Sequence, residues 1–120
     1  MLPEEIVKHY FDNLAKGDYS GIISLFSNDA IVISPLYGEK LANDFYKELL
    51  NDTNQSKILL KNIFINPSQK KVAAVHFLYE WTLKNGNISS FECVDIFEIN
   101  SIDRIKKLTI IYDTYPIRIK

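Results

Sequence analysis

The dipeptide Asn85-Gly86 lies between two long runs of alternating β-forming residues, and it constrains the fold more than any other feature. Asn-Gly is a preferred sequence for a tight turn between antiparallel strands. It therefore predicts a hairpin of two long strands, over residues 72–84 and 87–99. Because an isolated hairpin is marginally stable in water, other segments of the chain must cover it.

The segments around this hairpin predict the covering layer and the rest of a sheet. Apolar residues recur at helical spacing after Pro3, and Gly17 is expected to end that first helix. A short second helix is expected after Asp18, a third over residues 40–50, and a polar loop over residues 51–55. Further strands are expected over residues 30–34, 57–65 and 104–115. This order predicts an α+β fold in which three N-terminal helices pack on one curved antiparallel sheet.

The size and charge of the chain restrict its class. At 120 residues with 47% hydrophobic residues, we expect one domain over residues 1–120 with its own core. A net charge of −1 gives no basic surface for nucleic acid, and no apolar run is long enough to span a membrane. The acidic N-terminus lacks the apolar stretch of a signal peptide, and Cys93 is the only cysteine. We therefore expect a cytoplasmic protein without disulfides.

A two-residue loop at Asn85-Gly86 predicts the register of the hairpin. It places His76 opposite Asp95 and Leu78 opposite Cys93, on one face of the sheet. A β-bulge in either strand would shift this register. Phe77, Tyr79 and Trp81 then lie on the other face. Since both faces are apolar, we expect the helices to cover one and a second copy of the chain to cover the other. We therefore predict a homodimer, formed through the face of Phe77, Tyr79 and Trp81.

Asp95 is the residue most suggestive of chemistry. It lies between Val94 and Ile96, where an ionised carboxylate is costly and its pKa is expected to rise. His76 across the strand would then form an Asp–His pair, or share a proton with Asp95. The alternative is a structural pair that only satisfies two polar groups.

Four segments together resemble the nuclear-transport-factor-2-like (NTF2-like) superfamily, also called ketosteroid-isomerase-like, and especially its SnoaL-like branch. They are YFDNLAKGD from Tyr10, SNDAIVISP from Ser27, GEKLANDFY from Gly38 and VDIFEINSIDRI from Val94. Their order and spacing cover nearly the whole chain. The resemblance implies a cone, or cystatin-like α+β roll, with a pocket at its open end and commonly a dimer packed through sheet faces.

The resemblance also implies roles for individual residues. In ketosteroid isomerases, a tyrosine and a protonated aspartic acid donate hydrogen bonds to the developing enolate. By the resemblance, Tyr10 matches that tyrosine and Asp95 matches that aspartic acid. The base aspartate of those enzymes corresponds to Ser34, whose hydroxyl is no useful base. Ketosteroid isomerase activity is therefore expected to be absent.

Two functions follow as expectations. In the first, Tyr10, His76 and Asp95 catalyse proton transfer next to a carbonyl of a small hydrophobic molecule, as in an isomerase, cyclase or dehydratase. In the second, the pocket binds such a ligand without chemistry, or the domain only dimerises. No metal, nucleotide or other cofactor is expected. The predicted substrate-binding residues are Phe11, Leu14, Val32, Ser34, Phe45, Leu78, Phe91, Phe97, Leu108 and Tyr112.

Overall fold

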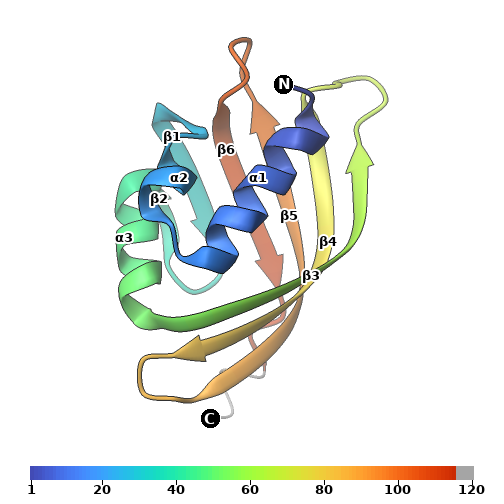
Figure 1. The fold of residues 1–120 in the computed structure, drawn as a ribbon. Helices are drawn as coiled ribbons and strands as arrows, with labels where there is room; N and C mark the ends of the chain where they lie inside the picture. The colour runs from blue at the N-terminus through green and yellow to red at the C-terminus, as the bar shows by residue number, and fades with distance from the viewer. Residues whose placement is uncertain (116–120) are drawn as a thin grey trace.

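The computed structural model describes residues 1–115, in which helices pack against one face of a curved sheet (Figure 1). The helix α1 lies across the sheet, and α2 and α3 lie beside it (Figure 1). Within residues 1–115, no helix is both long enough and apolar enough to cross a membrane. The helices are α1 (Pro3–Lys16), α2 (Tyr19–Ile23) and α3 (Ala42–Asp52).

The described strands form one mixed sheet in the order β2-β1-β6-β5-β4-β3. All neighbouring pairs are antiparallel except β1 and β6, which are parallel. The α+β class with helices on a curved sheet is therefore confirmed, but the sheet is not purely antiparallel as predicted, because β1 pairs in parallel with β6. The strands are β1 (Phe26–Ser34), β2 (Gly38–Leu41), β3 (Thr53–Ile65), β4 (Val72–Leu83), β5 (Ile88–Ile99) and β6 (Ile105–Tyr112).

The first helix forms because its apolar residues lie on one face and its ends are capped. The backbone N–H of Leu2 donates to Glu5 Oε1 at 2.7 Å, and Pro3 occupies the first turn, where a missing N–H costs nothing. Gly17 ends the helix in the left-handed conformation, at φ 68°. The buried face packs on the sheet and comprises Ile6, Val7, Tyr10, Phe11 and Leu14.

The N-terminal half differs from the prediction in two places. The short strand β2 was not predicted, and residues 51–55 form the end of α3 and the start of β3 rather than a loop. In both places, pairing with a neighbouring strand overrides local propensity.

The hairpin exists, but the predicted register is wrong by one residue. Leu83 N–H donates to Asn87 O at 2.9 Å, and Gly86 N–H donates to Leu83 O at 2.9 Å. The loop therefore has three residues and ends with Gly86 in a left-handed conformation, at φ 88°. Val75 consequently faces Asp95, and His76 faces Val94. A one-residue shift moves every side chain of one strand to the opposite face.

This register reverses the predicted faces of β4. Phe77 and Trp81 point to the concave side under the helices, where they are 3% and 4% exposed. His76 and Leu78 lie on the convex side, away from Asp95. The predicted dimer face of Phe77, Tyr79 and Trp81 and the predicted His76–Asp95 pair are therefore both wrong.

Substituting Gly86 with alanine is expected to lower the free energy of unfolding by about 1 kcal/mol, because a Cβ disfavours positive φ. Urea denaturation of the variant measures this loss. Asn87→Ala, at an exposed position beside the loop, is the matched control and should change stability by less than about 0.5 kcal/mol. Equal effects of the two substitutions would contradict the assigned loop.

Candidate functional site

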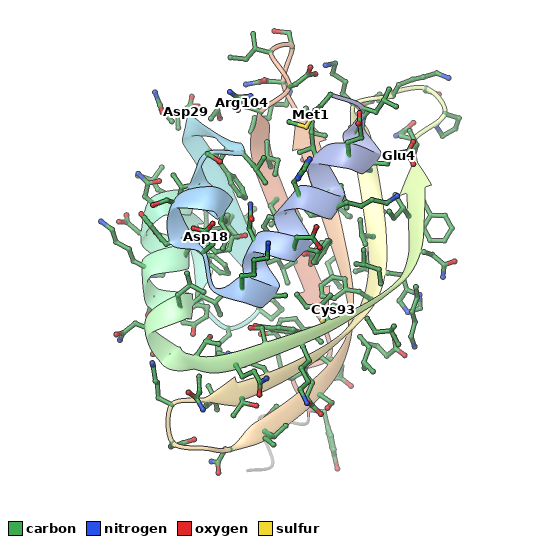
Figure 2. All side chains as sticks on the ribbon, in the orientation of Figure 1. Met1, Glu4, Asp18, Asp29, Cys93 and Arg104 are labelled. Carbon is green, nitrogen blue, oxygen red and sulfur yellow. The ribbon has the colours of Figure 1, made fainter. Side chains whose placement is uncertain are left out.

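The concave face of the sheet and the overlying helices enclose a cavity, which we call the inner pocket. Its space is about 510 Å³, part of it open to solvent. Figure 2 shows Cys93, one of its residues, in the body of the domain and away from Met1 and Arg104 at one edge. The lining residues are Tyr10, Leu14, Ser34, Tyr37, Phe45, Leu49, Phe77, Tyr79, Trp81, Phe91, Cys93, Asp95, Ile110 and Tyr112.

Among the described residues of this lining, Asp95 is the one with a carboxyl group. It lies on β5 opposite Ile110 of β6 and Val75 of β4, and it is 1% exposed. Its Oδ1 atom is buried and has no hydrogen-bond partner among the described residues. Burial raises the pKa of this carboxyl well above its usual range. Asp95 therefore favours the neutral acid, whose O–H group is a hydrogen-bond donor.

Two buried tyrosines lie close to Asp95. The hydroxyl of Tyr10, on α1, is 2.5 Å from the hydroxyl of Tyr46, on α3. Burial raises the pKa of both hydroxyls well above the ordinary value, and the nearby Asp95 adds to this effect. Tyr10 lines the inner pocket while Tyr46 lies behind it. Tyr46 thus holds the Tyr10 hydroxyl in place at the pocket wall.

Aromatic rings form much of the remaining wall. Tyr79 and Trp81 are stacked, with ring centroids 6.4 Å apart and an interplanar angle of 16°. Phe91 packs on Tyr112 with centroids 4.7 Å apart. Such walls favour flat apolar ligands through contact area and ring stacking.

Tyr37 and Ser34 close one side of the inner pocket. The Tyr37 hydroxyl donates to Asp52 Oδ2 at 2.6 Å, which joins the β1–β2 turn to the end of α3. Burial and this bond raise the pKa of Tyr37. The backbone N–H of Tyr37 donates to Ser34 Oγ at 3.1 Å. The Ser34 hydroxyl therefore holds the turn.

Cys93 precedes Asp95 on the same face of β5. Its thiol contacts the carbonyl of Phe91 at 3.8 Å, and burial raises its pKa to about 12. A thiol with so high a pKa stays protonated and is a weak nucleophile. Cys93 therefore contributes an apolar wall rather than a reactive group.

The predicted site residues divide into three groups. Phe11, Val32, Phe97 and Leu108 are buried core residues outside the pocket lining. His76 and Leu78 lie on the convex face, so they are not brought to the site. The residues that line the inner pocket are Tyr10, Leu14, Ser34, Phe45, Phe91, Asp95 and Tyr112.

His76 takes part in a surface network on the convex face. Its Nε2 is 2.7 Å from Glu92 Oε2, and Lys61 Nζ is 2.6 Å from Glu92 Oε1. Its Nδ1 is 3.3 Å from the side-chain nitrogen of Asn62. Lys61 and His76 together lower the pKa of the exposed Glu92. The polar atoms of His76 are therefore paired on the convex face, and His76 does not line the inner pocket.

Several lining residues were not predicted from the sequence. The β4 aromatic residues were assigned to the wrong face by the one-residue error in register. Tyr46 was overlooked although it shares a helical face with Phe45 and Leu49, a spacing that would have found it. The unpredicted lining residues are Tyr37, Leu49, Phe77, Tyr79, Trp81, Cys93 and Ile110.

Replacing Tyr46 with phenylalanine is expected to lower the free energy of unfolding by about 1–3 kcal/mol, because it leaves the buried Tyr10 hydroxyl without its partner. Chemical denaturation measures the change. Tyr19→Phe is the control, since that exposed hydroxyl makes only a 3.4 Å contact with Asn43 O. A Tyr46→Phe protein as stable as the Tyr19→Phe protein would show that the bond contributes nothing.

The chain matches no protein-family model and no curated protein. Among solved structures, SalBIII, an epoxide hydrolase/cyclase-like enzyme in pyran ring formation, superposes with a TM-score of 0.82 at 17% identity, covering 95% of this chain and 92% of that chain. TerC, co-crystallised with polyporic acid, gives 0.81 at 17% identity, covering 97% and 95%. An NTF2-like protein of unknown function from Exiguobacterium gives 0.76 at 17% identity, covering 90% and 98%. At such identity these similarities establish the fold, as the sequence resemblance predicted, and no activity.

Proposed function

Since the chain has the fold of NTF2-like and SnoaL-like proteins, we propose that its inner pocket binds a small apolar molecule. The neutral carboxyl group of Asp95 donates a hydrogen bond to a ligand oxygen in this proposal. One observation carries it: Asp95 is fully buried in an aromatic cavity, and its Oδ1 has no partner among the described residues. A buried polar group without a partner costs about 1–3 kcal/mol, which a ligand acceptor would recover.

The donors and walls define the ligand class. Asp95 and Tyr10 offer two O–H groups from neighbouring parts of the lining, and both favour the protonated form. A carbonyl, phenol or phenolate oxygen accepts two such bonds. The rest of the lining is mainly aromatic and aliphatic, so the body of the ligand is expected to be a flat apolar ring system.

Structural neighbours support a small-molecule pocket by analogy. SalBIII is described as an epoxide hydrolase/cyclase-like enzyme, and TerC was crystallised with polyporic acid. Both have this fold over most of their length. The analogy favours a small organic ligand over a protein or nucleic acid as the occupant of the inner pocket.

Catalysis of proton transfer next to a carbonyl is the second candidate. Burial raises the pKa of Asp95 and so favours its protonated form, which would supply a general acid. The reaction also needs a base, and the predicted base His76 lies on the convex face. Within the described lining, Ser34 accepts a backbone bond and Cys93 stays protonated, so neither replaces it. Binding, with acid catalysis on a ligand oxygen as its extension, is thus better supported.

Binding of 2-naphthol, a neutral aromatic alcohol with intrinsic fluorescence, tests the proposal. Asp95→Leu should weaken 2-naphthol binding by about tenfold to a hundredfold, because the variant cannot donate to the ligand oxygen. Asp95→Asn keeps a donor and should retain part of the affinity. Asp12→Leu, at an exposed position on α1, is the control and should bind like the wild type. Equal affinities of all four proteins, or no binding by the wild type, would reject the proposal.

We also propose that a second copy of the chain covers the convex face. No described element packs over this face, and its apolar side chains Leu59, Phe64 and Ile111 are 59%, 57% and 49% exposed. Lys61, His76 and Glu92 on the same face already pair within the chain, so the exposed apolar side chains would form the contact between two copies related by a two-fold axis. Light scattering should give a dimer mass at micromolar concentration and a monomer for Val94→Arg. A wild-type monomer would reject the dimer.

A further inference from the structure

A second cavity lies on the far side of the inner pocket wall, and we call it the outer groove. It holds about 500 Å³ of space, part of it solvent. It is lined by the end of α1 with Gly17 after it (residues 14–17), Leu50 of α3 and the start of β3 (residues 53–56). This lining is more polar than that of the inner pocket, because it includes Lys16, Thr53, Asn54, Gln55 and Ser56.

The two cavities share part of their wall. Leu14 lines both of them. Trp81, which lines the inner pocket, donates from Nε1 to Thr53 Oγ1 in the groove lining at 2.7 Å. Likewise the Tyr79 hydroxyl is 2.9 Å from Ser56 Oγ. The aromatic wall of one cavity is therefore joined by hydrogen bonds to the polar wall of the other.

The polar groups of the outer groove differ in availability. The hydroxyl of Thr53 donates to Leu49 O at 2.6 Å and accepts from Trp81, so it is occupied. The side chains of Lys16, Asn54 and Gln55 are exposed and make no hydrogen bond or ion pair to other described residues. Lys16 is the cationic residue in the described groove lining. A carboxylate is the group that this set recognises, since ammonium and amide N–H groups all donate to it.

We propose that the outer groove is a subsite for the acidic tail of the ligand whose ring occupies the inner pocket. This inference rests on the proposed function of the inner pocket, which supplies the ring site. The ring oxygen meets Asp95, the chain of the tail passes Leu14, and a terminal carboxylate reaches Lys16 with Asn54 and Gln55. Leu14 is the residue common to both linings, so in this proposal the tail reaches the outer groove by displacing the Leu14 side chain. The ligand class is an aromatic alcohol or ketone with a short carboxylate tail.

Three probes that share one ring test the subsite: 2-naphthol, 3-(6-hydroxy-2-naphthyl)propanoic acid and the primary amide of that acid. The acid should bind the wild-type protein about five to ten times more tightly than 2-naphthol, a gain typical of a partly exposed ion pair with added hydrogen bonds. Lys16→Gln should remove most of this gain while leaving the affinities for 2-naphthol and the amide unchanged. Lys8→Gln, an exposed change on α1 outside the groove lining, is the control.

The outcomes separate the two proposals. If 2-naphthol binds through Asp95 but the acid binds no more tightly, or keeps its gain in Lys16→Gln, the subsite is rejected and the ring site stands. If none of the three probes binds the wild type, both proposals are rejected. If the acid binds through Lys16 while Asp95→Leu leaves every affinity unchanged, the role of Asp95 fails and the groove stands as a carboxylate site.

Discussion

Replacing Phe77 with alanine is expected to lower the free energy of unfolding by about 3–5 kcal/mol, the range for removing a buried phenylalanine. Phe77 is 3% exposed, and its ring centroid lies 4.7 Å from that of Phe11 on α1. The substitution removes contact area between α1 and the sheet and leaves a cavity beside the inner pocket. Urea denaturation should show a lower midpoint with an unchanged slope.

Leu78→Ala is the matched control for Phe77→Ala. Leu78 is the next residue on β4, but it lies on the convex face opposite Leu59 and is only half-buried. Its truncation should cost less than about 2 kcal/mol, because part of its surface is already in water. If Leu78→Ala lowered the free energy of unfolding more than Phe77→Ala, the assigned register of the β4–β5 hairpin would be wrong, and the loop would have two residues.

Replacing Asp95 with asparagine is expected to make the protein more stable at pH 8, by about 1–3 kcal/mol, and to abolish most of the pH dependence that this residue causes. The carboxyl group of Asp95 is buried among apolar side chains, so its pKa in the folded protein lies well above the ordinary value. The asparagine amide cannot ionise, and it occupies nearly the same volume. The Asp95→Asn substitution is thus expected to raise the stability of the protein and to weaken its binding of the ligand.

The sign of the pH effect follows from the proton count. An unfolded aspartic acid titrates near pH 4, to within about a unit. From there up to the raised pKa of Asp95, the folded state holds a proton that the unfolded state has lost. The free energy of unfolding therefore falls as pH rises through this window, and the contribution of Asp95 is fully retained only below about pH 4.

Denaturation of wild type and Asp95→Asn at a series of pH values measures this contribution as a difference. Glu92 and Asp103 have pKa values lowered by their cationic neighbours, so they produce the opposite slope in acid. Both residues are present in the two proteins, and their effects cancel in the difference. A constant difference in stability from pH 4 to pH 8 would mean that Asp95 ionises normally in the folded protein.

The fold was predictable because its signals are local and consistent. Helical spacing after Pro3, the stop at Gly17 and the Asn85-Gly86 turn each agree with the structure. Strand β2 escaped prediction because it has only four residues, Gly38–Leu41, and is stabilised by pairing with β1. Pairing partners of that kind are set by the tertiary structure rather than by the segment itself.

The sequence predicted part of the lining of the inner pocket. The length of the loop at Asn85-Gly86 determined which side chains of β4 belong to that lining. Asn-Gly fits a two-residue loop and equally a three-residue loop that ends in a left-handed glycine, and the sequence does not distinguish them. The three-residue loop places His76 outside the inner pocket and Trp81 in its lining. Tyr10 and Asp95 both line the inner pocket, because the motifs in α1 and β5 that identified them do not depend on the register of the hairpin. Their role there stays a prediction.

The protonation state of Asp95 in the ligand-free protein tests the central claim most directly. Carbon-13 NMR of protein labelled at the aspartate carboxyl carbons, with Asp95→Asn to assign the signal, follows each carboxyl through a pH titration. We predict that the Asp95 signal remains that of the neutral acid at pH 7, although a free aspartic acid ionises near pH 4, to within about a unit. An Asp95 signal that ionises as a free aspartic acid does would contradict the account, because Asp95 would then have no proton to donate to a ligand oxygen.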